Sequence, residues 1–410
     1  MNIPTAEPLI LSYEDASRAV SEYAAIPARH VEPVALLAGL NRVLAKPIIA
    51  DRDQPPFARS TRDGFACRAA DLAATRPLAV IGQLRAGETW PGLPLMRGQA
   101  IEIMTGAPVP VGADCVLMIE HATVSGALAI PMRTVQPGEN IVPKGAESKA
   151  GAVLIAAGTR VGPQHMALAA ACGYETISVF AQPRVAILAT GDELVPLNQK
   201  PLSYQIRNSN SYSLAAQVLR YGGVPVIYPA VRDNLEDSEA AIRSAWDCDL
   251  MLLSGGVSMG KYDFVEQALT NLKSEFFFTG ARIQPGRPIV FGQLPVNGRN
   301  LPFFGLPGNP VSTLVTFTLF AAPLLAALAG ETDRGPTFAQ GRLTHSLEAK
   351  PNLTRFLPAS VKSSADGAAI CVIPWQGSGD QSAVAKTDCF LVAPPDKVFA
   401  EGDILTFLQL

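Results

Sequence analysis

The stretch LLSGGVSMGKYDF, residues 252–264, places glycines, hydroxyls and one carboxylate directly after an apolar run. The run itself, residues 250–253, is typical of a strand buried on both faces, and it stops at Ser254. Glycines let backbone N–H groups approach an anion closely, and a helix that begins next turns its positive end toward it. The stretch therefore predicts a buried parallel strand that ends in an anion-binding loop.

The composition limits the class of protein. The chain has 410 residues, 48% hydrophobic and 17% charged, which predicts a soluble protein of about two to four domains. Lys+Arg 33 against Asp+Glu 36 gives a net charge of −3, which argues against nucleic acid as the main partner. The six cysteines include no C-x-x-C pair, and the N-terminus has no signal-peptide pattern, so we expect a cytoplasmic protein with reduced thiols.

Strands and helices alternate between residues 183 and 330. Short apolar runs such as RVAILAT, CDLMLLSGG and LPFFGLPG are separated by helical segments such as SNSYSLAAQVLRYGG. Strands that are apolar on both faces and alternate with helices predict a parallel sheet covered by helices.

One segment, residues 311–330, is apolar and almost long enough to span a membrane. It lacks the basic or aromatic flanks of an anchor, and it follows Asn309 and Pro310, which are typical of a helix N-cap and first turn. We interpret it as a buried helix docked on the sheet, and expect no membrane association.

The remaining regions have a different texture. Apart from a few helices, they consist of short strands and turns rich in proline and glycine, which is typical of small β domains. The expected elements are a helix over 10–28 with Ser12 as N-cap, a helical or mixed piece over 33–46, a β-rich region over 47–145, a short helix over 163–173 and an all-β region over 331–410.

Three strands of the α/β region end in loops that combine glycine with hydroxyl or acidic side chains. These loops are Thr190-Gly191-Asp192-Glu193, Ser254-Gly255-Gly256-Val257-Ser258-Met259-Gly260 with Asp263, and Pro307-Gly308-Asn309-Pro310 with Ser312. Ligands of open parallel sheets bind beyond the carboxyl ends of the strands, so we expect the loops at one edge. The hydroxyls suit phosphate oxygens, whereas the carboxylates require a divalent cation, Mg²⁺ most simply, to bridge them to phosphate. The chain has no Walker A or G-x-G-x-x-G motif, which disfavours ordinary P-loop and Rossmann sites.

Other candidate residues stay open on the residues alone. Arg282 and Arg287 flank a Pro-Gly turn, which is either a solvated turn or a clamp for an oxyanion. Asp233 is either a helix N-cap or a site residue. Two proline-rich loops that contain Asp63 and Thr105 are as consistent with a structural role as with a functional one.

Five motifs occur in order along the chain: PPFxxSxxDGFA, IMTGAPVPxGAD, TGDEL, SGGVSxGxxD and PGNPVS. Together they resemble the molybdopterin molybdenumtransferase family, which includes MoeA and the E domain of gephyrin, over essentially the whole chain. The resemblance implies that the protein inserts molybdate into adenylylated molybdopterin. It also implies that the adenylate is hydrolysed, that AMP and molybdenum cofactor are released, and that Mg²⁺ or another divalent cation is required.

The resemblance also implies an architecture and partners. The fold would be multidomain α/β plus β, in the form of an elongated homodimer whose site lies between the α/β domain of one subunit and the β-rich insert of the other. Further partners would be the molybdopterin adenylyltransferase and the apo-enzymes that accept the cofactor. The implied domains are a linking domain (1–30 with 146–182), a β-rich insert (31–145), a molybdopterin-binding α/β domain (183–330) and a β-barrel-like domain (331–410).

Site roles follow from the resemblance residue by residue. The catalytic positions are Asp63, Thr105, Glu193, Asp233 and Asp263, and of these Asp63, Glu193 and Asp263 would hold the metal. The substrate-binding positions are Thr190, Gly191, Asp192, Ser254, Gly255, Gly256, Ser258, Gly260, Arg287, Pro307, Gly308, Asn309, Pro310, Ser312, Arg355 and Ser378, the last domain supplying Arg355 and Ser378 as oxyanion contacts.

The chain departs from the family pattern at a few positions. Arg62 stands where the family often has methionine, Val142 where it has arginine, Ala146 and Glu147 where it has Glu-Asp, and Gln284 where it has lysine. These departures motivate an alternative hypothesis, a diverged paralogue that binds or carries molybdopterin or its cofactor without turnover. A third hypothesis, an adenylyltransferase, is disfavoured by the complete insert and the C-terminal domain.

Overall fold

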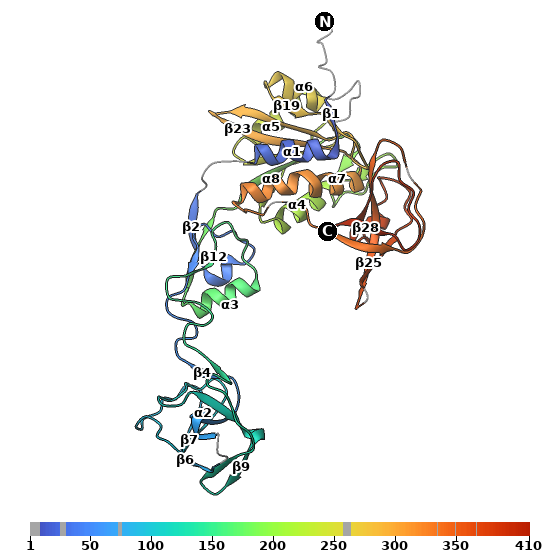
Figure 1. Ribbon diagram of the computed structural model, residues 1–410. Coiled ribbons are helices and arrows are strands. Elements are labelled where there is room, and N and C mark those ends of the chain that lie inside the picture. The colour runs from blue at the N-terminus through green and yellow to red at the C-terminus, as the bar shows by residue number, and fades with distance from the viewer. Residues whose placement is uncertain are drawn as a thin grey trace.

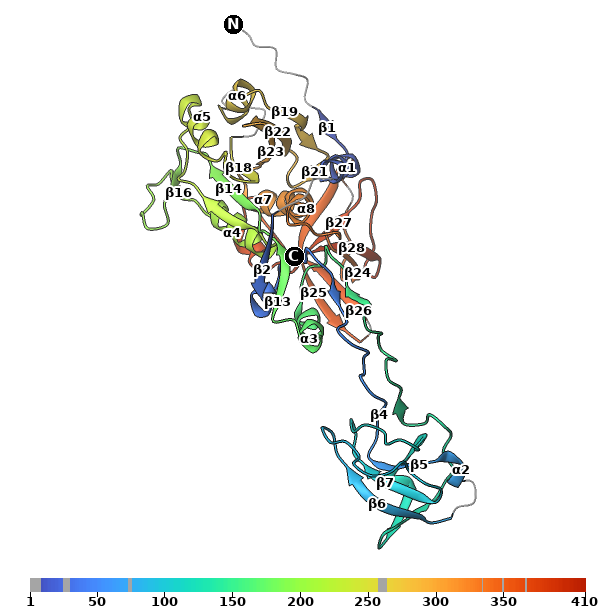
Figure 2. The same ribbon diagram turned by 90° about the vertical axis from the view of Figure 1, so that its left-hand side faces the viewer.

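The computed structural model describes residues 9–24, 30–72, 76–256, 264–333, 335–348, 350–365 and 367–410. The molecule is elongated: a β-rich insert lies at one end, and a two-stranded arm connects it to a body that holds an α/β sheet and a β-barrel (Figures 1 and 2).

A six-stranded sheet forms the centre of the body. Its order is β17 (Val224–Ile227), β14 (Arg184–Ala189), β18 (Leu250–Ser254), β23 (Arg299–Leu306), β22 (Val290–Val296) and β19 (Glu275–Phe278). The first four strands are parallel as predicted, but β22 runs antiparallel to both of its neighbours, β23 and β19. The reason is the Asn297-Gly298 pair, whose φ angles of 48° and 79° make a tight hairpin between β22 and β23.

Helices cover both faces of this sheet. Alternate residues of β14 separate the two cores: Val185 and Ile187 pack on one face, Ala186 and Leu188 on the other. The first face carries α1 (Tyr13–Tyr23), α4 (Asn210–Arg220), α7 (Pro310–Thr316) and α8 (Ala322–Leu328), and the second carries α5 (Leu235–Ser244) and α6 (Phe264–Asn271).

The apolar segment 311–330 forms a buried helix, as predicted. It runs continuously over Pro310–Leu328, with a π-helical turn at Phe317–Ala321 between α7 and α8. By length and composition it is the one helix of the described residues that could cross a membrane, but 89% of its apolar window is buried inside the protein. The segment is therefore a core helix of the α/β domain.

The linking region contains residues 31–35 and 48–49, which the sequence analysis assigned to the insert. β2 (Val31–Ala35) pairs with β13 (Thr176–Phe180), and β3 (Ile48–Ile49) pairs with β12 (Val153–Ile155). These strands pack with the 3₁₀ turn Leu36–Gly39 and with α3 (Pro163–Ala171). The predicted start of the insert at residue 31 is thus too early.

The helix predicted over 10–28 packs with the α/β domain and not with the linking domain. It begins at Tyr13, where the Ser12 side chain accepts a hydrogen bond from the Asp15 N–H, and its last helical residue is Tyr23. Its apolar side packs into the core of the α/β sheet rather than on the linking region, because Ala16 and Val20 are fully or almost fully buried there. The assignment of residues 1–30 to the linking domain is therefore wrong for this helix.

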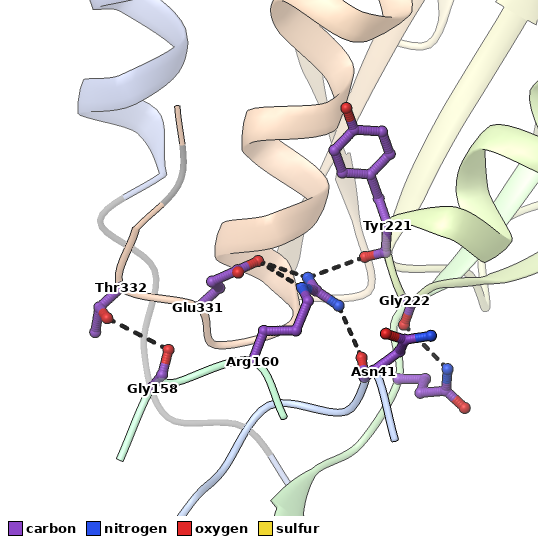
Figure 3. A network of polar contacts seen from close by, with 8 residues as sticks. Asn41, Gly158, Arg160, Tyr221, Gly222, Glu331 and Thr332 are labelled. Carbon is purple, nitrogen blue, oxygen red and sulfur yellow. Dashed lines mark hydrogen bonds and ion pairs between the residues drawn. The ribbon is translucent and has the colours of Figure 1, made fainter. Parts of the chain in front are cut away.

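Arg160 joins the linking region to the α/β domain (Figure 3). Its Nε and Nη2 atoms donate to Oε2 of Glu331 at 3.0 and 2.6 Å, and these two side chains are only 22% and 17% exposed. Its remaining donors reach the carbonyl groups of Asn41 at 2.8 Å and Tyr221 at 3.2 Å. This junction holds the linking region, from which the arm extends, against the α/β domain.

The insert has its own sheet and its own apolar clusters. The arm enters it through β4 (Arg59–Ser60), which pairs with β11 (Ile141–Val142), and the insert also carries the helix α2 (Ala69–Leu72) and the 3₁₀ turn Ile119–His121. The sheet order is β8 (Cys115–Met118), β5 (Gly64–Cys67), β7 (Gln99–Ile103), β6 (Leu78–Leu84), β10 (Leu128–Pro131) and β9 (Ala122–Ser125).

The C-terminal region closes into a barrel. Its strands are β25 (Thr354–Ser364), β26 (Gly367–Val372), β24 (Phe338–Leu343), β28 (Ile404–Gln409) and β27 (Cys389–Ala393), and the pairing of β25 with β27 completes the ring. β21 (Ile283–Gln284) of the preceding region adds to β25, and α9 (Gln381–Val384) lies between the barrel and α7. Two small pairs complete the inventory: β1 (Ile10–Leu11) with β20 (Gly280–Ala281), and β15 (Leu194–Val195) with β16 (Ile206–Arg207).

Candidate functional site

A cavity of about 880 Å³ lies at the carboxyl edge of the parallel strands. The loops that follow β14, β18 and β23 all contribute to its wall, so the structure brings the three glycine loops together. Of the predicted site residues, those that line it are Thr190, Gly191, Glu193, Asp233, Ser254, Gly255, Gly256, Pro307, Gly308, Asn309 and Pro310.

The loops pack so closely that only glycine fits at two positions. A Cβ on Gly255 would lie 2.7 Å from the carbonyl oxygen of Thr190, and one on Gly256 would lie 2.7 Å from Thr190 Oγ1. Both glycines have positive φ angles, 88° and 63°. The Thr190 hydroxyl is buried and has no hydrogen-bond partner among the described residues, which leaves a polar group available at the cavity wall.

Two acidic residues face the cavity. Glu193 is exposed, and its carboxylate lies against the Cα of Gly191, where φ is 146° and a side chain would collide with it. Asp233 lines the same cavity and exchanges hydrogen bonds with Asp192: each backbone N–H donates to the other carboxylate, at 3.2 and 3.4 Å. The helix N-cap is Asn234, which accepts from Asp237, so the N-cap interpretation of Asp233 is wrong.

These acids do not by themselves form a metal centre. Within the described ranges, no three or more His, Cys, Asp or Glu side chains are close enough to hold a metal ion. Asp263, one of the predicted ligands, lies outside the described residues, as do Ser258 and Gly260. The oxygen donors of Glu193 and Asp233 suit a hard cation such as Mg²⁺ chemically.

The predicted oxyanion contacts gather around the turn 284–287 and the first turn of α7. Gln284 pairs with Arg355 between β21 and β25, and the carbonyl of Ser378 accepts from the Val311 N–H at 3.0 Å. A Cβ on Gly286 would lie 3.7 Å from the carbonyl oxygen of Ser312. Arg287, Ser312 and Arg355 therefore lie at or beside the turn 284–287, and Ser378 lies beside the first turn of α7, but none of the four lines the cavity.

The arginines of this cluster differ in environment. Arg355 donates through Nη1 to the carbonyl of Glu348 at 2.9 Å, while its Nε is buried and has no partner among the described residues. Burial lowers the pKa of the Arg355 guanidinium. Arg287 is exposed, and the next residue, Pro288, lines the cavity. Ser312 is buried and is not part of the cavity lining, so it does not face a ligand there.

Asp63 and Thr105 form a pair in the insert. The backbone N–H and the hydroxyl of Thr105 both donate to Asp63 Oδ1 at 2.7 Å. These two hydrogen bonds hold the pKa of the Asp63 carboxyl below its ordinary value. Within one chain the insert lies at the far end of the molecule from the α/β sheet, so the structure does not bring this pair to the cavity (Figures 1 and 2).

Sequence reasoning missed one wall of the cavity. Residues 207–210 and Gln381 line it, and Gln381 Nε2 donates to Ser209 Oγ at 2.6 Å. Arg207 is the only basic residue of the lining, within the part of the chain that the structure describes. The polar run Asn208-Ser209-Asn210, at the start of a predicted helical segment, was the signal that could have revealed this wall.

The departures from the family pattern lie mostly in the arm. Val142 pairs with Arg59 between β11 and β4, and the same Arg59 forms an ion pair with Glu147 at 3.0 Å. Glu147 therefore stabilises the junction between arm and insert in this structure.

The fold and the site define a multidomain protein with a molybdopterin-binding type of α/β domain. The matching family models are, in order, MoeA N-terminal region (domain I and II) over residues 11–173, Probable molybdopterin binding domain over 186–327 and MoeA C-terminal region (domain IV) over 340–410. The chain belongs to the MoeA family, and the family and fold class predicted from the sequence are confirmed.

Curated relatives and solved structures agree with this. The chain is 31% identical over 387 residues to a molybdopterin molybdenumtransferase of Staphylococcus aureus (strain COL), covering 93% of this chain and 90% of the relative. It is 38% identical over 333 residues to that of Synechococcus elongatus, covering 79% and 82%. A molybdopterin biosynthesis MoeA structure from Pyrococcus horikoshii superposes with a TM-score of 0.80 at 27% identity, covering 98% of this chain and 100% of the other.

Proposed function

We propose that this protein is a molybdopterin molybdenumtransferase, which inserts molybdate into adenylylated molybdopterin and releases AMP and molybdenum cofactor. The observation that carries the proposal is the position of a phosphate-type cavity directly beside a turn rich in oxyanion-binding residues. The names of the curated relatives support the same activity.

The glycine loops suit the phosphate groups of the substrate. Gly255, Gly256 and Gly308 allow backbone N–H groups to approach an anion, and the helix over Pro310–Leu328 begins at the cavity, which favours negative charge at its start. The hydroxyls of Thr190 and Ser254 add donors at the same wall.

The carboxylates suit a divalent cation between them and the phosphates. Glu193 with Asp263, and Asp63 of a second subunit, would hold Mg²⁺, which would neutralise phosphate charge when bound. The described part of the site fits this group, because the Glu193 carboxylate is exposed at the cavity and oxygen is the ligand that Mg²⁺ prefers. Thr105 favours the ionised form of Asp63, which suits a metal ligand or a group that orients the attacking water.

Molybdate would bind at the neighbouring turn. Guanidinium groups bind tetrahedral oxyanions with fixed geometry, and Arg287 and Arg355 both flank this turn. This position lets molybdate approach the dithiolene of a substrate whose phosphates occupy the glycine loops.

A homodimer would complete the site. A single chain holds Asp63 and Thr105 in the insert, at the far end of the molecule from the α/β sheet, so in the proposed site a second subunit would supply them (Figure 2). Apolar side chains are exposed at both ends that would meet: Tyr204 is 71% exposed on the loop at the cavity, and Leu93 is 83% exposed on the insert.

The carrier hypothesis keeps one specific observation in its favour. Glu147, the acid nearest to the family's Glu-Asp position, is paired with Arg59 and so is not free to act in the site. A carrier would bind molybdopterin without turnover.

Reconstitution of an apo-molybdoenzyme tests the proposed function. The purified protein is mixed with adenylylated molybdopterin, molybdate, Mg²⁺ and an apo-enzyme, whose activity then reports the cofactor formed. We expect activation that Glu193→Gln removes. No activation by the wild-type protein, despite tight binding of the substrate, would favour the carrier.

A further inference from the structure

The side-chain amide of Asn210 joins two of the glycine loops. Asn210 is the first residue of α4 and lines the cavity. Its Nδ2 donates both to Ser254 Oγ at 3.0 Å and to the carbonyl oxygen of Gly308 at 2.7 Å. These loops follow the neighbouring strands β18 and β23, and a Cβ on Gly308 would lie 3.6 Å from the Cα of Gly255. The amide therefore ties the loops where they approach each other.

The chemistry of the acceptor decides which way the amide faces. A carbonyl oxygen can only accept a hydrogen bond, so the nitrogen of Asn210, and not its oxygen, must face Gly308. With the nitrogen fixed, the Ser254 oxygen receives a hydrogen bond and acts as an acceptor. Its own hydrogen is then left over, and no described residue receives it.

The Ser254 hydroxyl thus becomes a donor at the cavity wall. Ser254 is largely buried but lines the cavity, so the partner of this hydrogen must come from what occupies the cavity. A phosphate oxygen only accepts hydrogen bonds and carries charge, which matches a preoriented hydroxyl donor.

We propose that Asn210 is a positioning residue that directs the Ser254 hydroxyl hydrogen toward a phosphate group of the substrate. The inference rests on the proposed function, because it concerns the phosphate end of the same site. Asn210→Asp would reverse the arrangement: its carboxylate would accept the Ser254 hydrogen, and it would repel both the Gly308 carbonyl and the phosphate.

Calorimetric titration with inorganic pyrophosphate in the presence of Mg²⁺ measures this effect without turnover. Ser254→Ala weakens binding roughly tenfold or more, because a hydrogen bond to a charged group is lost. Asn210→Asp weakens it at least as much. Asn210→Ala weakens it roughly threefold to tenfold in the wild-type background, but less than about twofold when Ser254 is already alanine.

A substitution of an exposed asparagine outside the cavity serves as the control for this test. Asn300 is exposed on β23, at the end opposite to the cavity, and Asn300→Asp keeps wild-type binding. If Asn210→Ala weakens pyrophosphate binding equally with and without the Ser254 hydroxyl, the inference is overturned, because Asn210 would then only stabilise the loops. If the wild-type protein binds pyrophosphate and the Asn210 variants bind it equally well, this inference is overturned but the proposed function is not. Failure of the wild-type protein to bind pyrophosphate would overturn the proposed phosphate site as well.

Discussion

At the scale of single residues, Thr105 favours the ionised form of Asp63. Both donors of Thr105 bond to the same carboxylate oxygen, so they stabilise the charged form and lower its pKa. A depressed pKa in the folded state contributes stability above the unfolded-state pKa, and this contribution is lost as the pH falls through the folded-state pKa. The two hydrogen bonds thus extend the range over which Asp63 is an anion to lower pH.

Thr105→Val removes the hydroxyl donor but leaves the backbone N–H. We expect the pKa of Asp63 to rise part of the way toward its ordinary value, which a carbon-detected NMR titration of the carboxyl group measures. The stability contributed by the ionised form is then lost at a higher pH than in the wild-type protein. Thr123→Val, an exposed threonine on β9, is the control and leaves the titration unchanged. An unchanged pKa in Thr105→Val would show that the hydroxyl bond has no effect.

The Glu193 carboxylate needs Gly191 to have no side chain. Gly191→Ala adds a Cβ that collides with this carboxylate at a φ of 146°. We expect cofactor formation to fall at least about tenfold, because the displaced acid no longer faces the cavity, while strain costs only about 1–2 kcal/mol of stability. Gly298→Ala, at a positive φ in open space, controls for strain and keeps full activity. Normal activity in Gly191→Ala would remove Glu193 from the site.

At the scale of elements, prediction succeeded where burial is local and failed where partners are distant. β14, β18 and β23 were predictable because they are apolar on both faces and end in glycine loops. Residues 33–46 read as helical or mixed, but Val31–Ala35 forms a strand because its partner, Thr176–Phe180, lies far along the chain. The antiparallel β22 was signalled by Asn297-Gly298, a hairpin pair that the strand–helix alternation obscured.

We expect the Arg160 junction to limit the orientations of the arm relative to the body. Arg160→Ala removes the donors to Glu331, Asn41 and Tyr221 together, so we expect a loss of about 1.5–3 kcal/mol from the charged hydrogen bonds and a wider spread of arm orientations. Small-angle X-ray scattering measures the spread, and thermal unfolding the loss. Arg18→Ala, which loses an exposed ion pair with Asp15 at 3.1 Å, serves as the control. An unaltered scattering profile for Arg160→Ala would contradict the assigned role.

At the scale of the whole molecule, one chain contains all predicted parts of the site but separates them. The α/β cavity and the pair Asp63–Thr105 lie at opposite ends, and sequence reasoning alone could not place them together without the family resemblance (Figure 1). The loops at the sheet edge were predictable from the rule for parallel sheets. The wall around Asn210 and Gln381 was not, because it depends on how α4 and the barrel meet the sheet.

A composite site predicts complementation between inactive subunits. Asp63→Asn and Glu193→Gln are each expected to abolish activity, since each damages both sites of its own dimer. After subunit exchange, half of the dimers are mixed and each mixed dimer has one intact site, so activity returns to about a quarter of the wild-type level. No recovery in a mixture shown to exchange subunits would mean that Asp63 and Glu193 do not meet across subunits.

The most direct test of the proposed function is the release of AMP. The protein is mixed with adenylylated molybdopterin and Mg²⁺, with and without molybdate, and AMP is quantified by chromatography. The proposed function predicts AMP release that depends on molybdate and disappears in Glu193→Gln. Substrate binding without release would contradict it and identify a carrier, and consumption of ATP with molybdopterin would instead identify an adenylyltransferase.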